Sequence, residues 1–235
     1  AAAGWVVGRG APRARVALEA ERGFSRRQRN LADALLAQRS AAGVLQHAGR
    51  WLPEMSPVNV ATALHRIAKL ALSCNAMARE RIVEQDAIRA LKRAVVRHVE
   101  ATVGEGNGAV GRRSERASEM RCLSIICWSC ATLRIREEKL FDRVASVASS
   151  RLDEMKPFEL SNMLWAFAKL SLGHSSFFDS LAPHLLQRRE GQFGPQCLST
   201  IVWAFGTAKV HQAAVFTSFA RELAAGASTM APQGI

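Results

Sequence analysis

The segment Pro157-Phe-Glu-Leu-Ser-Asn-Met-Leu-Trp-Ala-Phe-Ala-Lys-Leu170 decides the fold of this chain, because the chain repeats it. The same pattern of apolar and small residues surrounds Trp128 and Trp203, which lie 37 residues before and 38 residues after Trp165. A period of this length leaves room for two helices per unit and is typical of an α-solenoid.

A fainter copy of the pattern spans residues 57–70, with His65 in the tryptophan position. The copies together predict an all-α fold, an α-solenoid (superhelix) of two-helix repeats of about 37–38 residues. We assign this helical-repeat domain to residues 28–225. Residues 1–27 are expected to form a basic N-terminal tail or targeting remnant, and residues 226–235 a C-terminal tail.

The apolar periodicity and the helix start signals place the individual helices. Ser56 and Pro57 predict a helix that runs to about Ala71. The second helix of this repeat is expected from about residue 78 to residue 99, and a Gly-rich insertion follows at residues 103–115. Three regular repeats follow, with first helices near residues 119–133, 157–171 and 195–209, and second helices near residues 136–150, 175–189 and 212–225.

The region before Ser56 is interpreted as an incomplete or capping repeat. Apolar residues recur at helical spacing through residues 28–52, and Gly43 is expected to separate two short helices. Terminal repeats are commonly atypical, which fits this position in the chain.

The tryptophan helix is apolar on almost every side, so a solenoid must surround it with neighbouring helices. We therefore expect Trp128, Trp165 and Trp203 to be buried and stacked in a row, one per repeat. The alternative is that these rings stack on nucleobases.

One stripe of the tryptophan helix stays polar and differs between copies. It comprises the positions three before, one after and four after the tryptophan, which read Thr62/Arg66/Lys69, Ile125/Ser129/Thr132, Asn162/Ala166/Lys169 and Thr200/Ala204/Thr207. Repeat proteins that read single-stranded RNA vary in this way from unit to unit. An unconstrained, solvent-facing strip is the alternative interpretation.

The charge of the chain favours an anionic partner. Lys and Arg number 32 against 20 Asp and Glu, a formal net charge of +12, and the excess lies in the first 150 residues. Residues 88–97 hold Arg89, Arg93 and Arg97 at helical spacing, with Lys92 beside them and no acid. This basic face predicts contacts with nucleic-acid phosphates, and a merely solvated helix face is the alternative.

The sequence offers little for catalysis or metal binding. Cys127 and Cys130 have the spacing of a metal or redox pair, but they align with the core positions Leu164 and Phe167 of the next repeat. No Ser/His/Asp or paired-carboxylate constellation is recognisable, so we predict no enzyme, no catalytic residue, no metal and no cofactor. No apolar run of 18 residues occurs, and no membrane span is expected.

The block Pro-x-x-Leu-Ser-x-x-Leu-Trp-Ala-Phe-Ala-Lys-Leu at residues 157–170 resembles the octotricopeptide repeat. It is also similar to the helical repeats of FAST-kinase-like and RAP-domain proteins and of RNA-editing substrate-binding complex proteins. Residues 59–70 resemble the opening repeat of such proteins. The resemblance implies a solenoid that binds RNA in a mitochondrion or plastid, in RNA processing, stability, translation or ribosome assembly.

We therefore expect a non-catalytic, organellar RNA-binding repeat protein that contacts single-stranded or structured RNA and other proteins of an organellar ribonucleoprotein. The alternative is a structural scaffold subunit of a larger organellar assembly such as a ribosome. The expected RNA-binding residues are Arg66, Lys69, Arg89, Lys92, Arg93, Arg97, Asn162, Lys169 and Thr200.

Overall fold

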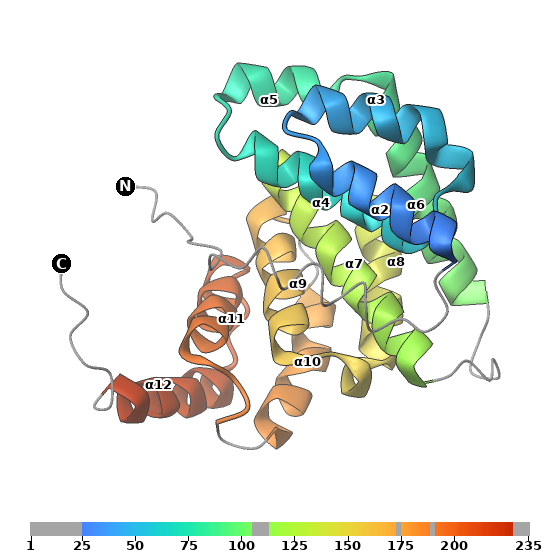
Figure 1. The fold of residues 1–235 in the computed structure, drawn as a ribbon. Helices are drawn as coiled ribbons and strands as arrows, with labels where there is room; N and C mark the ends of the chain where they lie inside the picture. The colour runs from blue at the N-terminus through green and yellow to red at the C-terminus, as the bar shows by residue number, and fades with distance from the viewer. Residues whose placement is uncertain (1–24, 105–112, 173–174, 189–190, 228–235) are drawn as a thin grey trace.

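The computed structural model describes residues 25–104, 113–172, 175–188 and 191–227. Within these ranges the chain folds into helices and contains no strand (Figure 1). Most of the expected N-terminal tail, most of the C-terminal tail and the centre of the Gly-rich insertion lie outside the described residues. The all-α prediction is confirmed.

The helices form two layers, each built from one helix per repeat. The first-helix layer consists of α2 (Arg26–Ala37), α4 (Pro57–Ala71), α7 (Arg113–Leu133), α9 (Pro157–Leu170) and α11 (Pro195–Thr207). The second-helix layer consists of α3 (Ala41–Trp51), α6 (Asp86–Gly104), α8 (Glu138–Ser150), α10 (Ser175–Gln187) and α12 (Ala213–Ala227). Each helix packs on its counterpart in the next repeat, which is the arrangement of an α-solenoid (Figure 1).

Three of the five first helices, α4, α9 and α11, begin at prolines, as expected for a residue that lacks a backbone N–H. Ser56 caps α4, since its hydroxyl accepts a hydrogen bond from the Asn59 N–H at 3.2 Å. Glu159 closes α9 in a related way, because its carboxylate accepts the Lys156 N–H at 2.9 Å. These caps satisfy donors that the helix itself leaves unpaired. The predicted bounds of the helix from Pro57 to about Ala71 are confirmed.

The first helices of the three regular repeats end in the same backbone conformation. Arg134, Ser171 and Lys209 have φ values of 60°, 51° and 56°. The next N–H then donates back into the helix: Ile135 to the Cys130 carbonyl at 2.8 Å, Leu172 to Phe167 at 3.4 Å, and Val210 to Phe205 at 3.1 Å. This is the long hydrogen bond of a Schellman motif, and it buries the apolar residue that follows the cap.

The upstream region differs from expectation at two points. The helix predicted from residue 78 to 99 is two helices, α5 (Ala76–Val83) and α6, because the chain turns at Glu84. Arg89 stabilises this turn by donating to the Glu84 carbonyl at 2.7 Å. Gly43 does not separate two helices either. It lies in the first turn of α3, where its N–H donates to the side chain of the N-cap residue Ser40.

The Gly-rich insertion is also shorter than predicted. Residues 103–104 end α6, and residues 113–115 begin α7, so both edges of the predicted range of residues 103–115 are helical. Glycine lowers helix propensity but does not prevent a helix end from extending over one residue.

In the C-terminal half of the described chain, phenylalanines that meet edge to face join the two layers within a mainly aliphatic core. Phe141 of α8 lies 4.9 Å from Phe167 of α9, measured between ring centroids. Phe178 of α10 lies 5.1 Å from Phe205 of α11. Cys130, which aligns with Phe167, is also buried, as its predicted core position requires. Such contacts join successive repeats into one continuous core.

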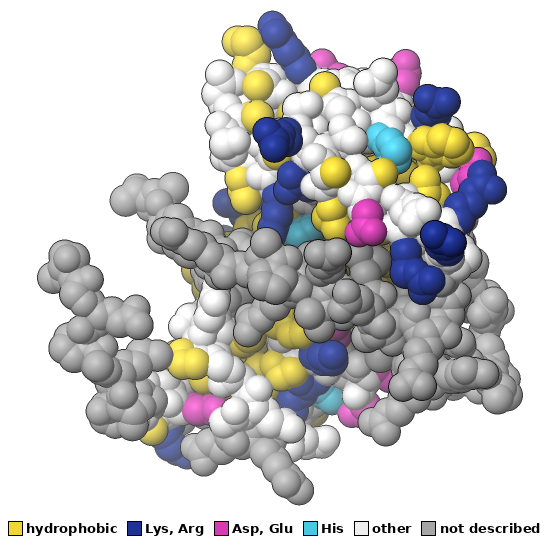
Figure 2. Space-filling view, in the orientation of Figure 1, with side chains coloured by type: hydrophobic (Ala, Val, Ile, Leu, Met, Phe, Trp, Pro, Cys, Tyr) yellow, Lys and Arg dark blue, Asp and Glu magenta, His cyan; other side chains and the backbone are white. Residues whose placement is uncertain are grey.

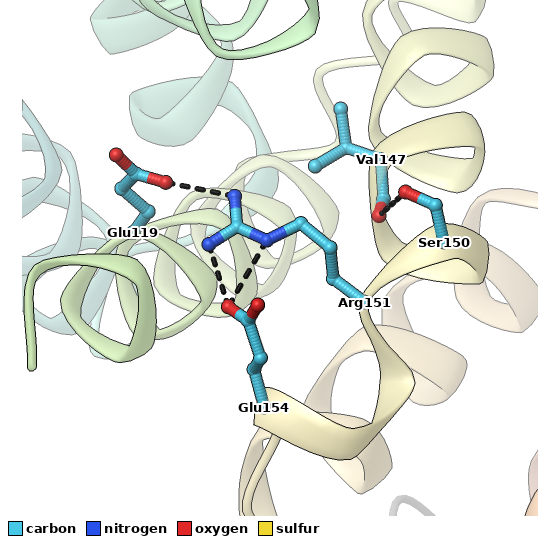
Figure 3. Close-up of polar contacts among 5 residues, drawn as sticks. All are labelled: Glu119, Val147, Ser150, Arg151 and Glu154. Atoms are coloured by element: carbon cyan, nitrogen blue, oxygen red, sulfur yellow. Dashed lines mark hydrogen bonds and ion pairs between the residues drawn. The ribbon is translucent and has the colours of Figure 1, made fainter. Parts of the chain in front are cut away.

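An arginine clamps the turn before α9 onto α7 (Figure 3). Arg151 donates to Glu119 at 2.7 Å and to Glu154, in the short turn η2 (Leu152–Glu154), at 2.6 Å. One period later, Arg188 takes a similar place and donates to the Met155 carbonyl at 2.8 Å. These guanidinium groups hold the connections between repeats in fixed positions.

Candidate nucleic-acid interface

A groove of about 480 Å³ runs along the exposed side of α6. The residues that line it are Arg89, Lys92, Arg93, Val96, Arg97 and Glu137. All four basic residues predicted on this helix therefore face one groove. Helical geometry places Arg89, Arg93 and Arg97 about 6 Å apart along the axis, because each residue rises 1.5 Å.

The apolar side of α6 determines this orientation. Ile88, Leu91, Val95 and Val99 are buried against the core, so the positions between them must face outward. This burial confirms the amphipathic pattern expected for residues 88–99.

Two of the four cations in the groove have acidic partners. Lys92 forms an ion pair with Glu137, the residue that precedes α8. Arg89 forms an ion pair with Asp86, whose side chain is 93% exposed, so solvent screens this pair strongly. Arg93 and Arg97 are exposed and make no ion pair with the described part of the chain. The groove therefore presents two uncompensated guanidinium groups.

The expected site residues of the first helices have mixed environments. Lys69 and Lys169 are exposed, while Asn162 is half-buried. Arg66 is also half-buried, and its guanidinium donates to the Gln38 carbonyl at 2.7 Å and 3.1 Å. Thr200 is buried, and its hydroxyl donates to the Gln196 carbonyl at 2.6 Å.

The predicted polar stripe is therefore not a continuous exposed surface. Its middle position is buried in the three regular repeats, at Ser129, Ala166 and Ala204. In the first-helix layer, α7 and α9 each lie between two other first helices and α11 packs against α9, so positions on the sides of these helices are covered.

The structure also divides the expected site between two layers. Arg89, Lys92, Arg93 and Arg97 belong to the second-helix layer. Arg66, Lys69, Asn162, Lys169 and Thr200 belong to α4, α9 and α11 of the first-helix layer. Figure 2, which views the first-helix layer, shows Lys and Arg side chains over α4 with a His side chain beside them.

Aromatic rings form a row across the first-helix layer. His65 meets Trp128 edge to face at 5.3 Å, and Trp128 stacks with Trp165 at 6.5 Å, measured between ring centroids. The stacking predicted for Trp128 and Trp165 is confirmed, although both rings are only half-buried.

The prediction that Trp203 is buried is wrong. Its side chain is 40% exposed, and it makes no ring contact among the described residues. The reason lies in the position of α11, which has a first-helix neighbour on its α9 side but none on its other side within the described chain.

The histidine of the aromatic row is held in its neutral form. Burial, together with the positive charges of Lys69 and Arg66, lowers the pKa of His65 from 6.5 to about 4. A neutral imidazole can pack against Trp128 without placing a third positive charge beside these two cations.

The cysteine pair lies in the core. Burial raises the pKa of Cys130 to about 12 and raises that of Cys127 as well, which keeps both thiols protonated. No cluster of three or more His, Cys, Asp or Glu side chains suited to a metal occurs among the described residues.

Sequence reasoning missed one set of surface cations. Arg134 is the first residue after α7 and Lys209 the second residue after α11, and both are exposed. Their signal in the sequence was their shared position six residues after the tryptophan, which becomes recognisable only once the helix ends are known.

No protein-family model and no curated protein sequence matches this chain. Among the helices of the described residues, none combines the length and apolar character that crossing a bilayer requires.

Proposed function

We propose that this protein is a non-catalytic RNA-binding repeat protein whose α6 groove holds the phosphate backbone of RNA. The observation that carries the proposal is the pair Arg93 and Arg97, exposed and without an ion pair in the described chain, in a groove shared with Arg89 and Lys92. The net charge of +12 supports the same class of partner.

The spacing of these side chains suits a nucleic-acid strand. The backbone positions of Arg93 and Arg97 are about 6 Å apart along the axis of α6, a spacing that suits successive phosphates of one strand. Arginine can also donate two parallel hydrogen bonds to one phosphate. Glu137 would stay beside Lys92, which leaves Arg93 and Arg97 as the principal phosphate contacts.

The biological setting in this proposal comes from the sequence resemblance. The block at residues 157–170 supports an organellar protein, in a mitochondrion or plastid, acting in RNA processing, stability, translation or ribosome assembly. The two-layer solenoid of two-helix repeats is compatible with that family of RNA-binding proteins.

A second candidate function is a scaffold subunit within a larger assembly. Leu72 and Met77 are 53% and 64% exposed and lie near each other in sequence, around the turn between α4 and α5. Protein contacts use contiguous exposed apolar surface, to which these two side chains would contribute. This surface is distinct from the α6 groove in its lining residues.

Fluorescence anisotropy with labelled RNA at several salt concentrations tests the proposal. The variant R93E/R97E should bind RNA more weakly, and its salt slope should fall by about 1.4, since each single-strand phosphate contact contributes about 0.7. The matched control is R39E/R221E, which reverses the same number of exposed charges outside the groove.

Three outcomes separate the candidates. A loss confined to R93E/R97E supports the groove as the site. Equal losses in both variants mean that only net charge matters, which contradicts the proposed site. An absence of salt-dependent RNA binding in the wild-type protein contradicts RNA binding altogether and favours the scaffold.

A further inference from the structure

One exposed cation stands at the C-terminal end of each of four neighbouring first helices. These cations are Lys69 of α4, Arg134 after α7, Lys169 of α9 and Lys209 after α11. None of them forms an ion pair with the described part of the chain. We call this row the cation edge.

The helices themselves place no acid at the cation edge, and Glu137 and Glu138, which follow Arg134 in the chain, pair with Lys92 and Arg136. The C-terminal halves of α4, α7, α9 and α11 contain no Asp or Glu. At the opposite end of the layer, Glu119 is paired with Arg151, and Glu159 accepts a hydrogen bond from the Lys156 N–H. The edge is therefore positive and complementary to an anionic ligand. The partial negative charge at each helix C-terminus compensates these cations only in part.

The aromatic row lies on the same helices as the cation edge. The row consists of His65, Trp128 and Trp165, and Trp203 occupies the corresponding position of the next repeat. The row brings aromatic rings to one layer of the molecule, and the Trp203 indole on the next first helix is 40% exposed and without a ring partner in the described chain. Trp203 is thus the most exposed member of the set.

We propose that Trp203 is a stacking platform for an unpaired nucleobase, with Lys209 and the rest of the cation edge contacting the backbone of the same single strand. This proposal rests on the RNA-binding function proposed above. It adds that a second surface binds the single-stranded form of the nucleic acid. Stacking on an aromatic side chain requires a base face that a duplex keeps covered by neighbouring bases. An exposed indole on a helix that is followed by an exposed cation suits a base and its phosphate together, whereas a purely apolar partner would leave the cations unpaired.

The test compares W203A with W203F in the full chain. Both should keep the helical circular dichroism of the wild-type protein, since Trp203 is partly exposed. The probe is a labelled adenine homopolymer RNA that carries 2-aminopurine, and a duplex RNA of the same length is the matched ligand control. W203A should bind the single strand about 5- to 150-fold more weakly, as expected for the loss of one stacked base, with an unchanged salt slope.

The same experiment has further outcomes that support or overturn the proposal. W203F should retain most of the single-strand affinity and the quenching of 2-aminopurine, and the affinity for duplex RNA should not depend on residue 203. Wild-type affinity and quenching in W203A would overturn the stacking proposal while leaving the α6 groove intact, provided that R93E/R97E still lowers the salt slope. A change in oligomeric state on W203A, without any change in RNA affinity, would instead assign Trp203 to a protein contact and overturn the proposal.

Discussion

The indole of Trp128 stacks on the indole of Trp165, with ring centroids 6.5 Å apart and planes inclined by 29°. The two residues lie 37 positions apart and occupy the same place on α7 and α9. This contact sets the register between neighbouring repeats, and it continues to His65 of α4 at 5.3 Å from Trp128. The same position in α11 lacks such a contact within the described chain, so one sequence feature has two structural outcomes.

The two kinds of tryptophan should respond differently to truncation. Trp165→Ala removes a half-buried ring with a stacking partner and should lower the free energy of unfolding by about 2–3 kcal/mol, somewhat less than a fully buried tryptophan would. Trp203→Ala should cost less than about 1 kcal/mol, since surface substitutions have small effects. Urea denaturation followed by circular dichroism measures both values. Equal costs would mean that the two rings contribute equally to packing, contrary to their exposure.

Acid should destabilise the protein through His65. Its folded-state pKa of about 4 lies below the unfolded value of about 6.5, so the unfolded state binds more protons between these values. The contribution is fully present above pH 6.5 and is lost as the pH falls toward 4, by up to about 3 kcal/mol. The difference in unfolding free energy between the wild-type protein and His65→Phe, measured from pH 7 to pH 4, isolates this group from the carboxylates. A difference that does not change with pH would contradict the assignment.

The ion pairs of Arg151 should contribute more to the free energy of unfolding than an exposed ion pair does. Arg151→Met leaves Glu119 and Glu154 without their guanidinium partner and should lower stability by about 1–2 kcal/mol. The matched control is Arg136→Met, which removes a pair with Glu138 in which both side chains are more than half exposed. This control should change stability by less than about 0.5 kcal/mol. Thermal and urea unfolding of the two variants give the comparison, and similar losses in both would exclude a special role for the clamp.

The helix ends offer a stabilising substitution. Ser171 has φ of 51°, a left-handed conformation that costs a non-glycine residue about 1–2 kcal/mol. Ser171→Gly should therefore raise the free energy of unfolding by about 0.5–1 kcal/mol, after the greater flexibility of glycine in the unfolded chain is included. The same change at the exposed helical residue Ser146 should lower stability by about 0.5 kcal/mol. A higher denaturation midpoint for Ser171→Gly and a lower one for Ser146→Gly would confirm the prediction. A lower midpoint for Ser171→Gly would contradict it.

The sequence by itself determined the architecture of the repeats. The recurrence of the tryptophan block fixed the period, and the apolar character of that helix required neighbours on several sides. Ser56 and Pro57 fixed the start of α4, because a capping hydroxyl and a residue without an N–H are both local features. The core positions of Cys127 and Cys130 followed from alignment between repeats, since equivalent positions face equivalent neighbours.

Tertiary structure alone decided which surface groups are available to a partner. Lys92 is paired because Glu137, 45 residues away, lies across the groove, and Arg66 is tied to the Gln38 carbonyl at the end of another helix. Periodicity records which side of a helix is apolar, but the exposure of Trp203 depends on whether a further helix covers it. Pairing and exposure are properties of contacts between helices distant in sequence. For that reason the exposure of Arg93, Arg97 and Trp203, and their lack of an ion-pair or ring partner within the described residues, follow only from the packing of the helices.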